Sequence, residues 1–155
     1  MADEHHYRVT ARWTGNRGQG TTGYRDYDRL VTIEAEGKPD LAASSDKPFR
    51  GDPERWNPED LLVAALSECH LLSYLHAAVT RGVVVTGYRD EATGTMTLVA
   101  NGGHFTEVTL HPVVTVADES MVAAAREAHH DAHEWCFIAN SVNFPVLVKP
   151  EIIVA

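Results

Sequence analysis

NPEDLLVAALSECHLLSYLHAAVTR, residues 57–81, has the residue spacing of one long helix. Asn57 can cap its start, Pro58 suits the first helical position, where no backbone N–H is needed, and Gly82 supplies the stop. Apolar residues recur at steps of three and four and continue nearly all the way round the helix. We therefore expect a helix that is buried at the centre of the fold and covered on several sides.

Length and composition predict one globular domain over residues 1–155, because the chain has 155 residues and 44% of them are apolar. Residues 1–5 are expected to be flexible. The net charge of −9 disfavours binding to nucleic acid or to an anionic membrane. The chain start does not resemble a signal peptide, and polar residues such as Glu68 and His70 interrupt the apolar helix, so we expect a cytoplasmic protein that does not span a membrane.

Strand patterns and one further helix fill the rest of the chain. The expected strands are residues 6–13, 24–35, 83–90, 93–100, 104–116 and 144–154, and the second helix is expected over residues 119–135. The segment between residues 37 and 56 has no periodicity and is expected to be a long loop of the kind that often carries function. One antiparallel hairpin or meander before the long helix, and a second meander after it, predict an α+β fold with antiparallel sheets around that helix.

Only two cysteines occur, Cys69 inside the long helix and Cys136 just after the second helix. In a reducing compartment such a pair is more often catalytic, redox-active or metal-binding than a structural disulfide. The thiolate is the nucleophile, and burial in an apolar helix favours the protonated thiol, so Cys69 needs a cation close by in order to react. An arginine suits this role because it stays charged when buried and can hold a carboxylate while it donates to sulfur.

Three segments resemble the OsmC/Ohr family of thiol-dependent peroxidases. They are NPEDLLVAALSECH from residue 57, the RGV and TGYRDEATG that follow, and CFIANSVNFPV from residue 136. The resemblance covers most of the chain from Trp13 onward. It implies that Cys69 is the peroxidatic thiol, Cys136 the resolving thiol and Glu59 an orienting carboxylate.

The resemblance also implies an arginine beside Cys69. Arg50, in the loop before the helix, matches the arginine of the OsmC branch. In the Ohr branch the arginine comes from the first hairpin, which makes Arg17 and Arg25 its rivals. On the apolar side of the site, Leu66 and Leu72 are expected to bind the substrate and to favour organic hydroperoxides over hydrogen peroxide.

The position of Glu59 predicts a dimer. Glu59 precedes Cys69 by ten residues, which is about 15 Å along a straight helix and far beyond hydrogen-bonding reach. A second copy must therefore supply the carboxylate, and a two-fold dimer with antiparallel central helices would do so. The intertwined homodimer of the family, with two active sites at the interface, is consistent with this.

The implied function is a cysteine-based peroxidase that acts in oxidative-stress defence. Cys69 would become a sulfenic acid, Cys136 would condense with it to a disulfide, and a lipoyl-protein, thioredoxin or small dithiol would reduce the pair without any cofactor. The alternative is a redox-sensing or metal-binding module without turnover. Its metal ligands would come from one helix face, with imidazoles and a thiolate at steps of three and four: His129, His130, His133 and Cys136. We expect no metal there, because no second cysteine lies at tight ligand spacing.

Overall fold

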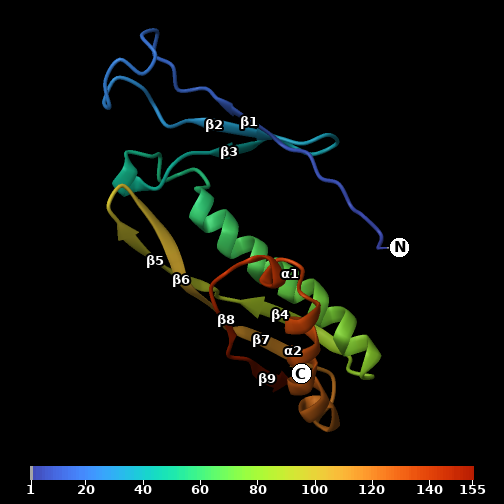
Figure 1. Ribbon diagram of the computed structural model, residues 1–155. Helices are drawn as coiled ribbons and strands as arrows, with labels where there is room; N and C mark the ends of the chain where they lie inside the picture. Colours follow the sequence, from blue (N-terminus) through green and yellow to red (C-terminus); the bar gives the residue numbers. More distant parts are fainter. Residues whose placement is uncertain (1) are drawn as a thin grey trace. The chain divides into compact units, whose positions relative to one another are not determined.

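The computed structural model describes residues 2–155, which group into two compact units, one ending at Leu61 and the other covering residues 62–155 (Figure 1). The long helix α1, Pro58–Thr80, begins in the first unit and continues into the second. Its start is capped as the sequence predicts, because the Asn57 side chain accepts a hydrogen bond of 2.7 Å from the Asp60 N–H. Residues 2–9 contain no helix or strand, and their flexibility and the single-domain organisation stay predictions.

The first unit contains a three-stranded antiparallel sheet in the order β1-β2-β3. Its strands are β1, Thr10–Trp13, β2, Val31–Glu34, and β3, Leu41–Ala43, followed by the short 3-10 helix η1, Lys47–Phe49. The first two strands are shorter than expected, and the prediction of a loop throughout residues 37–56 was wrong. A three-residue strand is too short to show alternation in the sequence; β3 is a strand because its backbone pairs with β2 and, at Ala43, with Trp56.

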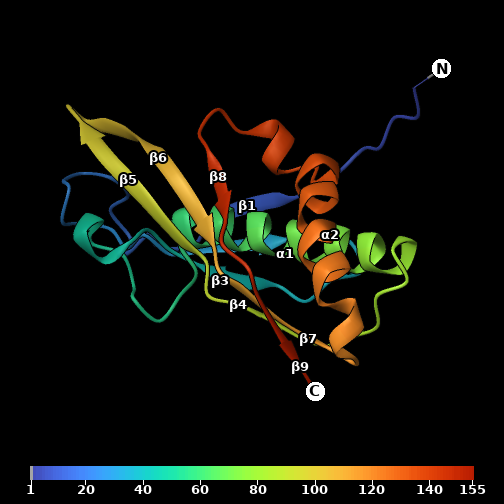
Figure 2. The same cartoon turned by 90° about the horizontal axis from the view of Figure 1, so that it is seen from below.

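The second unit contains two three-stranded sheets, ordered β4-β7-β9 and β5-β6-β8 (Figure 2). Their strands are β4, Val85–Asp90, β5, Thr93–Val99, β6, Gly102–Leu110, β7, Pro112–Val116, β8, Val146–Val148, and β9, Glu151–Val154. The antiparallel pairing expected within residues 83–116 is confirmed between β4 and β7 and between β5 and β6, but these strands do not form one meander, because β4 and β5 lie in different sheets. The last two strands make both sheets mixed, since β8 pairs with β6 and β9 pairs with β7 in parallel. The residues expected as two long strands, 104–116 and 144–154, each form two strands that pass from one sheet to the other. Pro112 and Pro150 lie at these breaks, where a residue without a backbone N–H is tolerated.

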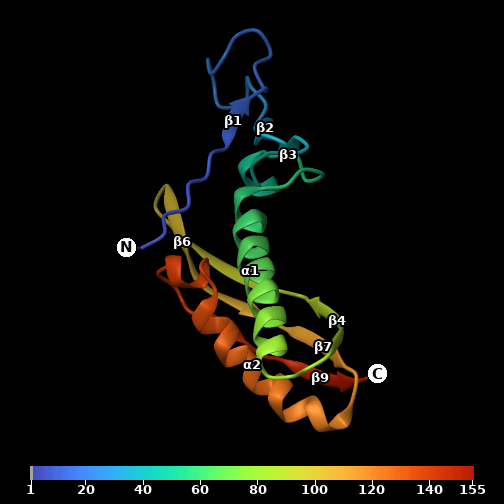
Figure 3. The ribbon, with the colours of Figure 1, turned by 90° about the vertical axis from the view of Figure 1, so that its right-hand side faces the viewer.

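The second helix, α2, Val122–Trp135, connects β7 to β8 and lies beside α1 within the second unit (Figure 3). The 3-10 turn η2, Glu119–Met121, precedes it, so the predicted helix over residues 119–135 is confirmed with a tighter first turn. The Tyr74 hydroxyl of α1 donates a hydrogen bond of 3.0 Å to the Ala125 carbonyl of α2. Around this contact the small residues of α2, such as Ala128 and Ala132, form a hydrophobic core with the β-sheet.

Only one face of α1 is buried. Leu66, His70, Tyr74, Ala77 and Ala78 are buried along it, whereas Leu72 and Val79 are 58% and 75% exposed. The expected cover on several sides of this helix is therefore not found within a single chain. By length and composition alone α1 could cross a membrane, despite its polar residues, although the core helix of a globular protein passes the same test.

Candidate functional site

The two cysteines are neighbours in the second unit, although they lie on different helices. Cys69 is in the middle of α1, and Cys136 is the first residue beyond α2. Both are free thiols, and Cys69 lies near enough to Cys136 to raise the pKa of the Cys136 thiol. The structure thus brings together the two sulfurs that the sequence singled out.

Hydrogen bonds at two places hold these thiols in position. Two residues before Cys69, the Ser67 hydroxyl donates a 2.5 Å hydrogen bond to the Asp90 carboxylate, which ties α1 to the end of β4. Beyond Cys136 the chain turns back, and the Asn140 N–H donates to the Cys136 carbonyl at 3.0 Å. The Ser141 hydroxyl donates to the Phe137 carbonyl at 2.7 Å. The small polar residues after Cys136 are therefore explained by the hydrogen bonds that close this turn.

Burial distinguishes the two thiols chemically. Cys136 is only 1% exposed, whereas Cys69 is partly exposed. Burial raises the pKa of Cys136 to about 11, the hydrogen bond from the Ala139 N–H opposes this, and the neighbouring Cys69 thiol adds to the rise. At neutral pH Cys136 is therefore a protonated thiol that an external reactant does not reach directly.

A groove lies between residues that neighbour the two cysteines in the chain, although neither cysteine lines it. Its volume is about 550 Å³, and it is lined by Leu72, Ser73, His76, Glu134, Trp135, Phe137 and Asn140. Ser73 lies one helical turn after Cys69, and Phe137, which is 81% exposed, directly follows Cys136. Of the two residues expected to bind substrate, Leu72 lines this groove, whereas Leu66 is fully buried in a hydrophobic core with Val108 and Leu110.

Glu59 and Arg50 belong to the first unit, and their roles beside Cys69 stay predictions. Glu59 is the second residue of α1, and its Oε2 is buried with no hydrogen-bond partner among residues 2–155. Arg50 is exposed and ends η1 in the left-handed conformation with φ of 65°, where its N–H donates to the Lys47 carbonyl at 3.0 Å. The rival Arg17 donates to the Arg25 carbonyl.

Arg29 is an arginine of the first unit that the sequence did not single out. Its guanidinium lies over the rings of Tyr24 and Tyr27, at 4.4 and 4.0 Å from their centroids. It also donates hydrogen bonds to the carbonyls of the same two residues. The spacing of the three residues gave no signal for this contact, because the contact depends on how the chain turns between them.

The histidines expected as alternative metal ligands differ in burial. His129 is buried and shares a hydrogen bond of 3.0 Å with His70 of α1, whereas His130 and His133 are exposed. Among residues 2–155, no group of three or more histidine, cysteine or acidic side chains could hold a metal ion. The metal-binding alternative therefore has no geometric support in this part of the chain.

A sequence profile of the OsmC-like protein family matches residues 51–151, which include both cysteines. The chain belongs to the OsmC-like protein family. The resemblance to the OsmC/Ohr proteins read from the sequence is thereby confirmed. The mixed sheets and the long helix described above are the α+β fold of this family.

Similar proteins cover nearly the whole OsmC-like chain. An OsmC-like protein of unknown function from Vibrio cholerae is 30% identical, covers 95% of this chain and 99% of its own, and superposes with a TM-score of 0.84. The uncharacterized protein YmaD of Bacillus subtilis is 24% identical over 154 residues, which are 97% of this chain and 95% of YmaD. An organic hydroperoxide resistance protein from Elizabethkingia anophelis is 18% identical over the full length of both chains, with a TM-score of 0.71, which demonstrates the shared fold.

Proposed function

We propose that this OsmC-like protein is a cysteine-based hydroperoxide reductase that protects the cell against oxidative stress. The observation that carries the proposal is the pairing of a partly exposed thiol, Cys69, with a buried thiol, Cys136, whose pKa the neighbouring Cys69 raises. A peroxide reaches the first sulfur and not the second. Membership of the OsmC-like family and a fold shared with an organic hydroperoxide resistance protein support the same role.

In the first step the Cys69 thiolate attacks the distal oxygen of the hydroperoxide. The O–O bond breaks, the alkoxide takes a proton and leaves as the alcohol, and Cys69 becomes a sulfenic acid. The sulfur of Cys136 then attacks the sulfur of Cys69, and the hydroxyl of the sulfenic acid leaves with the Cys136 proton as water. An external dithiol reduces the resulting disulfide to two thiols and is itself oxidised to a disulfide.

The groove that Leu72 lines supports an organic substrate. Leu72, Trp135 and Phe137 offer apolar contacts to the hydrocarbon part of a hydroperoxide, which hydrogen peroxide lacks. Leu66 lies in the core and is left out of this role. We propose a lipoyl-protein, a thioredoxin or a small dithiol as the reductant.

The complete site is proposed to require two chains in a cytoplasmic homodimer. Glu59 and Cys69 are on one continuous helix, about 15 Å apart by the helical rise. The exposed apolar residues of α1, which include Leu72 and Val79, would be covered by a second copy. In that dimer Glu59 would orient the charge partner of Cys69, for which Arg50 is the first candidate and Arg17 and Arg25 are the rivals.

Consumption of tert-butyl hydroperoxide in the presence of dithiothreitol tests the proposal. The wild-type chain should turn over many times, with or without a chelator, and Cys69→Ser should be inactive. Cys136→Ser should be oxidised once and then stall or over-oxidise, which intact mass measurement detects. Equal turnover by Cys69→Ser would refute the peroxidase. A single oxidation of the wild-type chain without turnover would favour the redox-sensing alternative.

A further inference from the structure

The turn that follows α2 directs a backbone N–H at the sulfur of Cys136. The Ala139 N–H donates a hydrogen bond to this sulfur, with 3.4 Å between the nitrogen and Sγ. The Ile138 N–H acts on the same thiol, because it also lowers the pKa of Cys136. Since Cys136 is only 1% exposed, these N–H groups take the place of the water that would otherwise solvate the sulfur.

The turn holds this donor in place through hydrogen bonds of its own. The Asn140 N–H donates to the Cys136 carbonyl at 3.0 Å, and the Asn140 side-chain amide donates to the Glu134 carbonyl of α2 at 2.9 Å. The Ser141 hydroxyl donates to the Phe137 carbonyl at 2.7 Å. The N–H therefore does not have to move when charge develops on the sulfur, and donors fixed in advance in this way stabilise a developing charge best.

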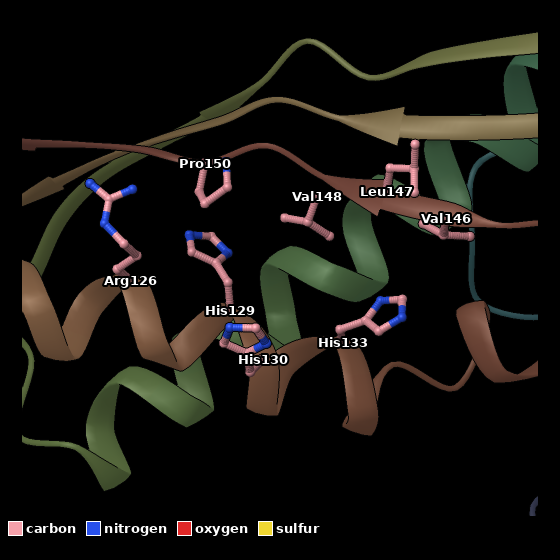
Figure 4. Close-up of a pocket in the computed structure, with 8 residues that line it drawn as sticks. All are labelled: Arg126, His129, His130, His133, Val146, Leu147, Val148 and Pro150. Carbon is pink, nitrogen blue, oxygen red and sulfur yellow. The ribbon is translucent and has the colours of Figure 1, made fainter.

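The cationic side chains of α2 are directed elsewhere. Arg126 and the three histidines of α2 line a cavity of about 390 Å³ that also contacts Val148 and Pro150, and neither cysteine lines this cavity (Figure 4). Within residues 2–155, the pKa of Cys136 is shifted by burial, by the two backbone N–H groups and by the Cys69 thiol. In this part of the chain, a negative charge on Cys136 thus depends on the backbone of the turn.

Reduction of a Cys69–Cys136 disulfide puts such a charge on this sulfur. Because Cys136 is buried and Cys69 is partly exposed, a thiolate of the dithiol reductant attacks the Cys69 sulfur. The S–S bond breaks, its electron pair goes to the Cys136 sulfur, and the reductant is left joined to Cys69 as a mixed disulfide. The second thiol of the reductant then loses its proton, which passes through water to the Cys136 thiolate, and attacks the mixed disulfide. Cys69 leaves as a thiolate, and the reductant leaves as a disulfide.

We propose that the Ala139 N–H is a catalytic group of this reduction, which donates its hydrogen bond to the Cys136 sulfur as that sulfur leaves. A hydrogen bond to a thiolate is stronger than one to the sulfur of a disulfide, so the donor stabilises the transition state more than the starting disulfide. The inference rests on the proposed peroxidase for its place in the catalytic cycle. It assigns to the turn after α2 a role in the reductive half of that cycle.

An ester in place of one amide removes this donor without changing a side chain. Cys136 allows native chemical ligation of residues 1–135, as a thioester, to a synthetic peptide of residues 136–155 in which lactic acid replaces Ala139. The ligated all-amide chain is the reference. Ligated Ser141→Ala is the matched control, because it loses a hydrogen bond of the same turn and keeps the Ala139 N–H. Each folded chain is oxidised with diamide, and reduction of its disulfide by dithiothreitol at pH 7 is followed by alkylation of the free thiols and intact mass.

We expect the ester chain to be reduced about fivefold more slowly or worse, because it lacks one hydrogen bond to a charged leaving group. Ser141→Ala should be reduced at the reference rate. The proposal is overturned if the ester chain and the reference are reduced equally fast, or if Ser141→Ala is slowed as much as the ester chain.

A second measurement leaves Ala139 unchanged and decides the case even if the ester chain does not fold. The disulfide of the wild-type chain is treated with 2-mercaptoethanol, the free thiols are alkylated, and the peptides are identified by mass spectrometry. The mixed disulfide should be found on Cys69 and the alkyl group on Cys136; the reverse arrangement would show that Cys136 is not the leaving group and would overturn the proposal.

These experiments separate the role of Ala139 from the proposed function, because diamide forms the disulfide without peroxide. Equal reduction rates in a chain that consumes peroxide would remove only the role of Ala139. Slow reduction of the ester chain, in a protein that does not consume peroxide, would support the donor and refute the peroxidase. If diamide forms no Cys69–Cys136 disulfide, both proposals are overturned.

Discussion

Lowering the pH should destabilise the protein through one pair of buried imidazoles, His70 and His129. Their rings are parallel and joined by the 3.0 Å hydrogen bond between α1 and α2, and they are 1% and 5% exposed. Burial lowers the pKa of His70 to about 4, with His133 lowering it further and Asp90 opposing. Burial likewise lowers the pKa of His129 to about 3, and the neighbouring His70, Arg126 and His130 add to this. Both imidazoles are therefore neutral in the folded protein at any pH above about 5.

The sign and size of the effect follow from proton uptake. Unfolding exposes both rings, whose pKa then returns to about 6.5, so below that pH the unfolded chain binds more protons than the folded one. Near pH 5 the difference approaches two protons, and each proton changes the free energy of unfolding by about 1.4 kcal/mol per pH unit. The stability should thus fall by about 2 kcal/mol per pH unit between pH 6 and pH 5 from this pair alone.

Urea unfolding at several pH values between 7 and 5, at one protein concentration, measures this slope. His129→Gln should lose about half of it, because only one titrating imidazole then remains in the core. His104→Gln is the control, since His104 is exposed on β6, and it should keep the wild-type slope. A slope that is the same in the wild type and in His129→Gln would refute the argument, whatever the absolute stability of the variant.

Three further predictions concern the proposed peroxidase. Arg50→Met should move the alkylation of Cys69 by a neutral reagent to higher pH by about one unit or more. If the pH dependence of alkylation is unchanged in Arg50→Met but shifted in Arg25→Met, the arginine that partners Cys69 belongs to the first hairpin. Mixing inactive Glu59→Ala chains with inactive Cys69→Ser chains, both folded and exchanging subunits, should restore activity, because one heterodimer site then has an intact Cys69 and the partner's intact Glu59. If no activity returns after the subunits have exchanged, Glu59 does not contribute to a site shared by two chains. Leu72→Ala should raise KM for an organic hydroperoxide by about fivefold and leave that for hydrogen peroxide unchanged; equal effects on both substrates would exclude Leu72 from substrate contact.

Local signals predicted α1 correctly. The cap at Asn57, Pro58 at the first position and the stop at Gly82 act within a few residues of the helix ends, so the sequence contains all that is needed to place them. The spacing of the cysteine motifs likewise identified the family. Sheet pairing was beyond such signals, because the parallel partners of β6 and β7 lie beyond α2 in the chain and are selected by packing.

The histidine pair and the groove could not be predicted for a related reason. His70 and His129 are 59 residues apart, and nothing in the local pattern of either helix indicates that their rings meet. On α2 the cluster of histidines favours an exposed polar face, which is correct for His130 and wrong for His129. The placement of Phe137 depends on the turn after Cys136, whose hydrogen bonds form only once α2 has ended.

The burial of Cys136 has a kinetic consequence. Because Cys136 is buried and Cys69 is partly exposed, a reductant of the proposed disulfide would have to attack the sulfur of Cys69, the atom that the peroxide would also meet. The peroxide and the reductant would therefore approach the same exposed side of Cys69, and the alcohol formed from the peroxide would have to leave before the reductant could bind. The proposed peroxidase should therefore show double-displacement kinetics, in which the peroxide reacts with the reduced form of the protein and the reductant with the oxidised form, at the same sulfur atom.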